Sequence, residues 1–96
     1  MHKGKVVLVS MSGYNPLRDD PLLRDLIESK IELFCAVGVD ADKWEDALDW
    51  LCIGDSGEGG HYITTTSHPD EREEDVVEFA HSFATERAHD VEVIRV

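Results

Sequence analysis

The sequence predicts an α/β fold: a compact three-layer sandwich in which helices cover both faces of a four-stranded, mostly parallel sheet. Three observations favour this fold. Segments with strand character alternate with segments of helical periodicity, in the order β-α-β-α-β-α-β. The first strand is almost continuously apolar, which is typical of a strand buried on both faces. Strands that alternate with helices are joined by right-handed crossovers, which makes the strands parallel.

The chain is long enough for one small domain. Its 96 residues, 42% of them hydrophobic, can build a single core, so residues 1–96 are predicted to form one domain. The predicted strand order is 2-1-3-4, as in flavodoxin-like proteins.

The first strand is expected over residues 5–11, KVVLVSM. Residues 12–21 contain Gly, Asn, two prolines and paired aspartates, a composition typical of a loop. The first helix is predicted to start with Asp20 as its cap and Pro21 at its first position. Its apolar stripe consists of Leu22, Leu23, Leu26 and Ile27.

The segment that follows allows two interpretations. Ile31 and Phe34 would continue the apolar stripe, which would give one long helix. We prefer a break at residues 29–30 and a buried strand over residues 31–39, IELFCAVGV, because its aromatic and β-branched residues favour a strand. Gly38 would end this strand.

The second half repeats the alternation. The second helix is expected to open at Asp42, with Glu45 at the spacing of a capping box, and to end near residues 53–54. Residues 54–60, GDSGEGG, are predicted to form a flexible loop. Residues 62–66 then form the third strand, residues 70–88 a long acidic helix, and residues 91–96 the fourth strand.

The charge of the chain restricts its partners. Twenty-one acidic residues face nine basic ones, which gives a net charge of −12. The basic residues are scattered, whereas binding to nucleic acid needs clustered Lys and Arg, so no nucleic-acid partner is predicted. An acidic surface suits a basic protein partner. The alternative is that the charge only keeps a small protein in solution.

The chain also lacks the signals of membrane and secreted proteins. No apolar run approaches the roughly 18 residues that span a bilayer, so no membrane partner is expected. The basic start of the chain precedes a short apolar run with no small-residue cleavage site, so we expect a cytoplasmic location. Cys35 and Cys52 lie in apolar stretches without a C-x-x-C motif, as reduced cytosolic thiols do.

Motifs for cofactors and metals are missing. No His/Cys pair has the spacing of a zinc site, and neither G-x-G-x-x-G after a strand nor G-K-[ST] occurs, so no metal and no cofactor is predicted. G-D-S-G resembles the surroundings of the nucleophile in trypsin-like serine proteases. Only four residues match, and the predicted topology places Ser56 on the edge opposite His68, so no catalytic Ser56 is expected.

Ligands of such sheets bind beyond the carboxyl ends of the strands, here near the switch between the first and third. The candidate ligand-binding residues at this edge are Ser12, Asn15, Asp40, Ser67 and His68. His68 is the one catalytic candidate, because histidine titrates near neutral pH. The structural alternative is that Ser67 caps the third helix and Pro69 opens its first turn.

The third helix begins with six acids and one Arg between Asp70 and Glu78. It is either a solvated face or a docking surface for a basic partner. Trp50 lies off the apolar stripe of its helix, and an exposed Trp is often an interaction hot spot; packing at the sheet margin is the alternative. The candidate partner-binding residues are Trp50, Glu71, Glu74 and Glu78.

Three motifs carry a resemblance to a known group of proteins. They are the T-T-S-H-P-D-E junction, the V-V-E-F-A helix after it and the W-E-D-A-L-D helix before it. With these motifs the chain resembles small uncharacterised bacterial proteins classed as domains of unknown function. The resemblance covers most of the chain and implies no activity and no catalytic residues.

Two classes of function follow. The first is a non-enzymatic acidic interaction module: a regulator, inhibitor or adaptor that binds another protein. The second is a small-ligand or enzymatic site around Ser12, Asp40 and His68. Because an open sheet has edges that can pair with another chain, a homodimer is a third alternative.

Overall fold

The structure is a computed structural model that describes residues 4–56, 63–85 and 90–96, with the backbone alone at 53–56. Its elements are β1 (Lys5–Ser10), α1 (Pro16–Glu28), β2 (Leu33–Gly38), α2 (Ala41–Ser56), β3 (Thr64–His68), α3 (Glu73–Ser82) and β4 (Val91–Arg95). The four strands form one sheet, in which every pair of neighbours is parallel. The predicted α/β class and the alternation of elements are therefore confirmed.

The predicted strand order 2-1-3-4 is wrong, because the order is β3-β2-β1-β4. β2 lies inside the sheet and β3 at its edge. Composition explains this: the first five residues of β2, LFCAV, are buried, whereas the residues of β3, TTTSH, are all half-buried. At the edge of the sheet the hydroxyl groups of β3 can reach polar partners, whereas in a central strand they would be buried without such partners. The direction of the strand order therefore reverses between β1 and β4, not between β1 and β3.

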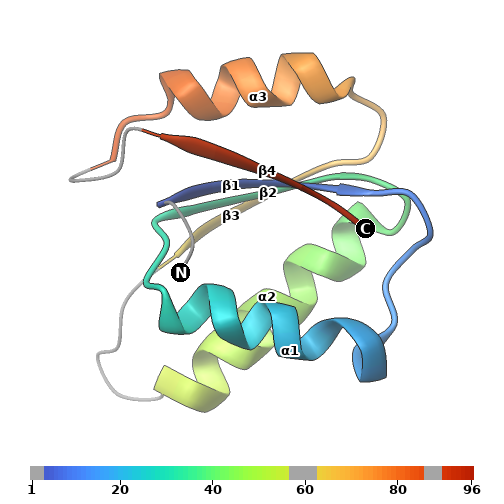
Figure 1. Cartoon of the computed structure of the whole chain (residues 1–96), viewed down its shortest axis with the longest axis vertical. Coiled ribbons are helices and arrows are strands. Elements are labelled where there is room, and N and C mark those ends of the chain that lie inside the picture. The colour runs from blue at the N-terminus through green and yellow to red at the C-terminus, as the bar shows by residue number, and fades with distance from the viewer. Residues whose placement is uncertain (1–3, 57–62, 86–89) are drawn as a thin grey trace.

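The helices form the outer layers of the sandwich. Figure 1 shows α1 and α2 on one face of the sheet and α3 on the other. The steps from β1 to β2 and from β2 to β3 run the same way, so right-handed crossovers place α1 and α2 together. The return from β3 to β4 runs the opposite way and places α3 on the second face. Each face has a buried core, built around Phe34 and Trp44 on one side and around Val7, Cys35 and Val76 on the other.

α1 begins earlier than predicted. Asn15 is its cap: the side-chain Oδ1 accepts a hydrogen bond from the backbone N–H of Leu17 at 3.0 Å. Pro16 is the first helical residue, so Pro21 lies inside the helix instead of opening it. Asn15 and Pro16 start the helix in place of Asp20 and Pro21, because the side chain of Asn15 accepts a hydrogen bond from a free N–H group of the first turn. The predicted break is confirmed, since α1 ends at Glu28 with Ser29 as its cap.

The turn from β2 into α2 depends on a glycine. Gly38 has φ of 94°, and a Cβ atom there would lie 2.5 Å from the carbonyl oxygen of Ser10. Only glycine fits this backbone and this approach. α2 begins at Ala41, one residue before Asp42, and continues to Ser56. The first three residues of the predicted 54–60 loop are therefore helical, and residues 57–60 lie outside the described part of the chain.

The junction between β3 and α3 differs from the prediction. The strand runs to His68, because a residue before proline disfavours the helical conformation, and Pro69 follows. Tyr62, predicted to begin this strand, is not among the described residues. α3 begins at Glu73, so Ser67 is not its cap and Pro69 is not in its first turn. The helix ends at Ser82, whereas the prediction extended to residue 88, and residues 86–89 lie outside the described ranges.

A buried lysine marks the end of α3. Lys5 is 2% exposed, and its Nζ donates hydrogen bonds to the carbonyl oxygens of Ala80 at 2.9 Å and Phe83 at 2.7 Å. A cation there satisfies free carbonyl groups and complements the helix dipole. β1 and α3 are thereby joined at the amino edge of the sheet.

Candidate functional site

The predicted ligand residues of the first two turns are engaged in local hydrogen bonds. The carboxylate of Asp40 accepts a hydrogen bond from the backbone N–H of Tyr14 at 3.0 Å, which joins the turn after β2 to the turn after β1. Asn15 caps α1, and the hydroxyl of Ser12 accepts a hydrogen bond from Arg18 at 3.4 Å. The structure thus brings Ser12, Asn15 and Asp40 to one region, where they hold two turns together.

The turn after β1 is also held by the side chain of Ser10, the last residue of β1. The hydroxyl of Ser10 accepts hydrogen bonds from the backbone N–H of Gly13 at 3.2 Å and from Nε1 of Trp44 at 3.0 Å. Asp19 is 4% exposed and forms an ion pair with Arg18 at 2.7 Å. The hydrogen bond from Arg18 lowers the pKa of Asp19, against the raising effect of burial. Sequence reasoning missed Asp19 because its segment was predicted to be a loop.

Ser67 and His68 lie on the edge strand β3. Ser67 Oγ donates to the carboxylate of Asp42 at 2.5 Å. One ring nitrogen of His68 contacts the hydroxyl of Thr66 at 2.8 Å, and the other contacts the carboxylate of Glu71. β2 lies between β3 and β1 in the sheet. Ser67 and His68 therefore have contacts different from those of Ser12, Asn15 and Asp40. Both ring nitrogens of His68 have partners within the chain.

The described residues contain neither a cluster of metal ligands nor a membrane-spanning helix. Within residues 4–56, 63–85 and 90–96, no group of three His, Cys, Asp or Glu side chains is placed to hold a metal ion. No helix in these ranges is long and apolar enough to cross a membrane. Cys35 and Cys52 are free thiols, and burial raises the pKa of Cys35.

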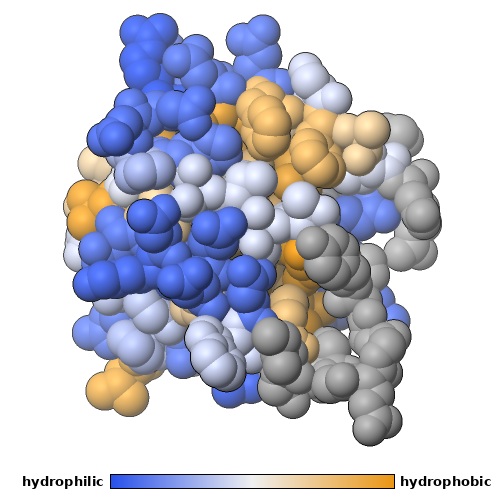
Figure 2. Space-filling model, turned by 180° about the vertical axis from the view of Figure 1, so that it is seen from behind, coloured by the Kyte–Doolittle hydropathy of each residue, from blue (hydrophilic) through white to orange (hydrophobic). Residues whose placement is uncertain are grey.

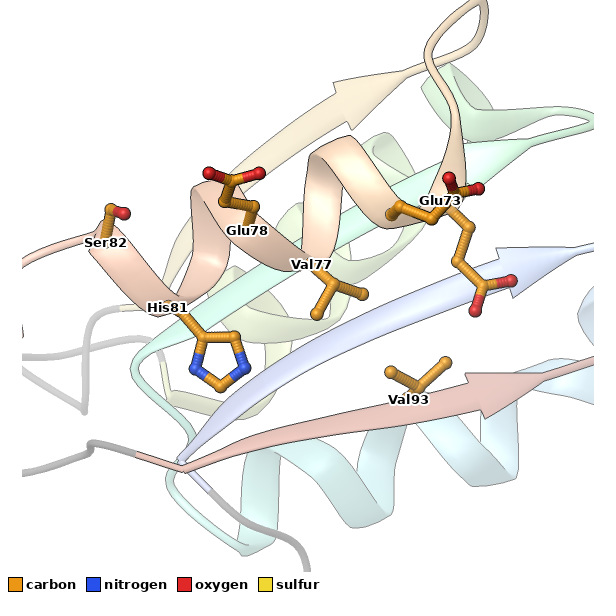
Figure 3. A pocket seen from close by; sticks show the side chains of 7 residues that line it. Glu73, Val77, Glu78, His81, Ser82 and Val93 are labelled. Atoms are coloured by element: carbon orange, nitrogen blue, oxygen red, sulfur yellow. The ribbon is translucent and has the colours of Figure 1, made fainter.

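A groove between α3 and β4 gathers acidic side chains over an apolar floor. It has a volume of about 460 Å³. Figure 3 shows Val77 of α3 and Val93 of β4 facing each other across this groove, with His81 pointing into it and Glu78 on its outer rim. We call it the acidic groove; its lining residues are Glu73, Glu74, Val77, Glu78, His81, Ser82 and Val93.

The charge of the acidic groove is negative. Three of its described lining residues are glutamates, and no described lining residue is Lys or Arg. Arg95 contacts Glu73 from the end of β4, and Arg72 lies 3.6 Å from Glu74. Glu78 carries its charge into solvent. The spacing of acids in the helix indicated this surface, but the opposing Val93 could not be found without the strand order.

A second groove lies on the other face of the sheet. It has a volume of about 430 Å³ and is lined by Tyr14, Pro16, Asp20, Lys43, Asp46, Ala47, Trp50 and Leu51. Trp50 is 74% exposed, so of the two alternatives for this residue the exposed one holds. The sheet separates it from α3. The predicted partner-binding residues therefore belong to two surfaces: Trp50 on one face, and Glu71, Glu74 and Glu78 on the other.

The surface seen from behind is mostly hydrophilic. Figure 2 shows polar side chains over most of this view and hydrophobic ones gathered at the upper right, where the second half of α3 lies. The described aromatic residues of that segment are Phe79 and Phe83, whose ring centroids are 5.7 Å apart. Phe79 also packs on His68, with ring centroids 5.4 Å apart.

The fold and the two grooves define a small three-layer α/β protein with acidic, partly apolar surface grooves. Residues 2–96 match the family described as Domain of unknown function (DUF7684). Because this match spans nearly the whole chain, the protein belongs to that family, and the predicted resemblance to a domain of unknown function is confirmed. Neither a curated protein nor a solved structure matched the chain.

Proposed function

We propose that the protein is a non-enzymatic interaction module that binds a basic protein partner through the acidic groove. The observation that carries this proposal is the pairing of three glutamates with the apolar floor of Val77 and Val93. Apolar area supplies binding free energy, and complementary charge selects and steers the partner.

The ligand site around Ser12, Asp40 and His68 has less support. The side chains of these residues contact Arg18, Tyr14, and Thr66 with Glu71, respectively. A ligand there would have to replace hydrogen bonds that already hold the turns. The acidic groove needs no such rearrangement, since its carboxylates face solvent or exposed Arg side chains.

Trp50 supports binding on the second face. Its exposed indole lies beside Leu51 and Tyr14, with Asp20 and Asp46 in the same groove. Large exposed aromatic side chains are enriched at the centres of interfaces. We propose this groove as a second contact surface, which would let the module bridge two partners or hold one partner on both faces.

The test is capture of partners from cells of the source organism with variants of each groove. Glu74→Gln with Glu78→Gln removes two charges from the acidic groove. Glu28→Gln with Asp70→Asn makes the same change in net charge at exposed positions outside both grooves. Trp50→Ala tests the second groove.

The proposal predicts a basic protein that is retained by the wild type and by the Glu28/Asp70 variant. The Glu74/Glu78 variant should lose it, and raised salt should release it, because exposed charges are screened. Equal retention by both double variants would overturn the acidic groove as the binding site. Loss with Trp50→Ala alone would assign binding to the second face instead.

A further inference from the structure

We infer that the partner contributes an extended basic segment that joins the sheet as a fifth strand beside β4. This inference rests on the proposed function and specifies how the acidic groove is occupied. It is carried by three features of the described residues: the open edge of β4, the face on which its side chains lie, and the charge along that face.

Among the described residues, the outer edge of β4 has no strand partner. β4 ends the sheet, and no described strand pairs with its outer side. Val96 N–H donates to Val9 at 3.0 Å, and the carbonyl of Val96 accepts from Met11 at 2.7 Å, so the backbone of Val96 points toward β1. Backbone direction alternates along a strand, so the N–H and C=O groups of Val93 and Arg95 point to the open side.

The side chains of the same residues lie on the face of the sheet that α3 covers, where Val93 lines the acidic groove. Val93 packs with the core under α3 and lines the groove, and Arg95 contacts Glu73 on α3. A strand added beside β4 would therefore place alternate side chains against α3, next to Val93 and Val77. An apolar residue suits that floor, and basic residues on either side of it would meet the glutamates. Strand addition of this kind combines main-chain hydrogen bonds with side-chain selectivity.

The charge selects a basic segment rather than a second copy of this chain. Two β4 edges in contact would bring two sets of Glu73, Glu74 and Glu78 together, in chains that each carry a net charge of −12. Like charges across a strand pair destabilise it. At the opposite edge, β3, the side-chain hydroxyls of Thr65 and Ser67 hydrogen bond to Asp49 and Asp42 of α2, and the acidic groove is absent there.

The probe is the heptapeptide acetyl-TKTVTKT-amide, in which Lys, Val and Lys share one face of a strand. Binding to the full chain is followed by NMR titration and by hydrogen exchange of the backbone amides. We expect slower exchange at Val93 and Arg95 on addition of the peptide, with no matching change at Thr65 and Ser67 on the β3 edge.

Two control peptides separate the inference from the proposed function. The acidic twin acetyl-TETVTET-amide keeps the strand propensity and reverses the charge. The parent peptide with an N-methyl group on every backbone amide keeps the charge but has no N–H group on either edge with which to pair as a strand. We expect the N-methylated peptide to bind at least about tenfold more weakly, since it loses two or more hydrogen bonds.

Each outcome decides one of the two proposals. Equal binding of the N-methylated and parent peptides overturns strand addition and leaves the acidic groove as a charged docking surface. Equal binding of the acidic twin, or no binding of the parent, overturns both. Protection of Val93 and Arg95 that rises with protein concentration and without peptide shows a second copy at the edge and overturns the basic segment.

Strand addition can also be tested with a variant of the protein in place of a modified peptide. Val93→Pro removes one outward N–H, and proline is tolerated on an edge strand when its missing N–H faces outward. The variant should weaken the parent peptide by a larger factor than the N-methylated peptide, because both lose contact with the side chain of Val93 but only the parent also loses a backbone hydrogen bond. If it does not fold, the comparison of peptides on the wild type still decides the question.

Discussion

Arg95, the last residue of β4, forms an ion pair with Glu73, the first residue of α3. The pair joins the edge strand to the helix at one end of the acidic groove. The side chain of Arg95 is 60% exposed and that of Glu73 is 31% exposed, so solvent screens the pair and its stabilising effect is small. Its larger effect is on the groove, because the guanidinium group offsets one of the three carboxylates.

Arg95→Gln should strengthen binding of a cationic peptide. The substitution frees Glu73 for the ligand, and a few-fold lower Kd is expected, about 0.5–1 kcal/mol, with little change in Tm. The measurement is an NMR titration with acetyl-TKTVTKT-amide at low and high salt. Lys30→Gln is the matched control, since it makes the same charge change at an exposed position outside both grooves. Equal gains in both variants would show a general charge effect.

Glu45→Gln should stabilise the protein at neutral pH. Burial raises the pKa of Glu45, and the nearby Asp49 and Asp46 add to this effect. Ionisation of Glu45 therefore lowers the free energy of unfolding at pH values above its raised folded-state pKa. This penalty disappears as the pH falls below the ordinary value of 4.5, where the group is protonated in both states.

The advantage of Glu45→Gln in Tm should accordingly shrink between about pH 8 and about pH 3. Thermal unfolding of both proteins across this range measures it. Glu28→Gln, an exposed carboxylate of α1, is the control for the change in net charge. A gain that stays constant with pH would contradict the role given to burial.

Lys5→Met should destabilise the protein strongly. Methionine fills a similar volume but cannot donate to the carbonyl groups of Ala80 and Phe83, so the end of α3 loses its buried partner. The expected loss is about 1.5–3 kcal/mol, the range for hydrogen bonds to a charged group. Urea unfolding measures it, and Lys30→Met, at an exposed position, is the control. Similar small losses in both variants would mean that Lys5 is dispensable.

Ser10→Ala should destabilise the carboxyl edge of the sheet. It removes the acceptor shared by the backbone N–H of Gly13 and the indole N–H of Trp44, and leaves two buried donors without this partner. A loss of about 1–3 kcal/mol is expected from urea unfolding. Ser12→Ala, at an exposed position in the same turn, should change stability by less. A neutral Ser10→Ala would indicate that water replaces the hydroxyl.

Much of the secondary structure could be predicted from local pattern. The apolar runs of β1 and β2, the break at Ser29 and the alternating β4 were all found from the sequence. Two of the errors fell at helix starts, where two chemical signals competed. Asn15 with Pro16 began α1 in place of Asp20 with Pro21, and Pro69 kept His68 in the strand and delayed α3 to Glu73.

The candidate site could be predicted only in part. The acids of α3 follow from the sequence, whereas helical spacing left exposure and packing at the sheet margin as two alternatives for Trp50, and the structure shows it exposed. Their separation onto opposite faces of the sheet does not follow from the sequence. The predicted ligand residues lie at the predicted edge, and three of them, Ser67, Ser12 and His68, contact Asp42, Arg18 and Glu71, respectively. Their role in binding a ligand stays a prediction.

The sequence by itself determined the number, type and order of the elements, the buried character of β1 and β2, and the strong negative charge. These are local or compositional properties, set by period, propensity and residue count. The tertiary structure alone decided the strand order, the burial of Lys5 under α3, and the meeting of Val77 with Val93 in the acidic groove. Each of these joins residues far apart in the chain, and such pairings depend on how whole elements bury their apolar faces against one another.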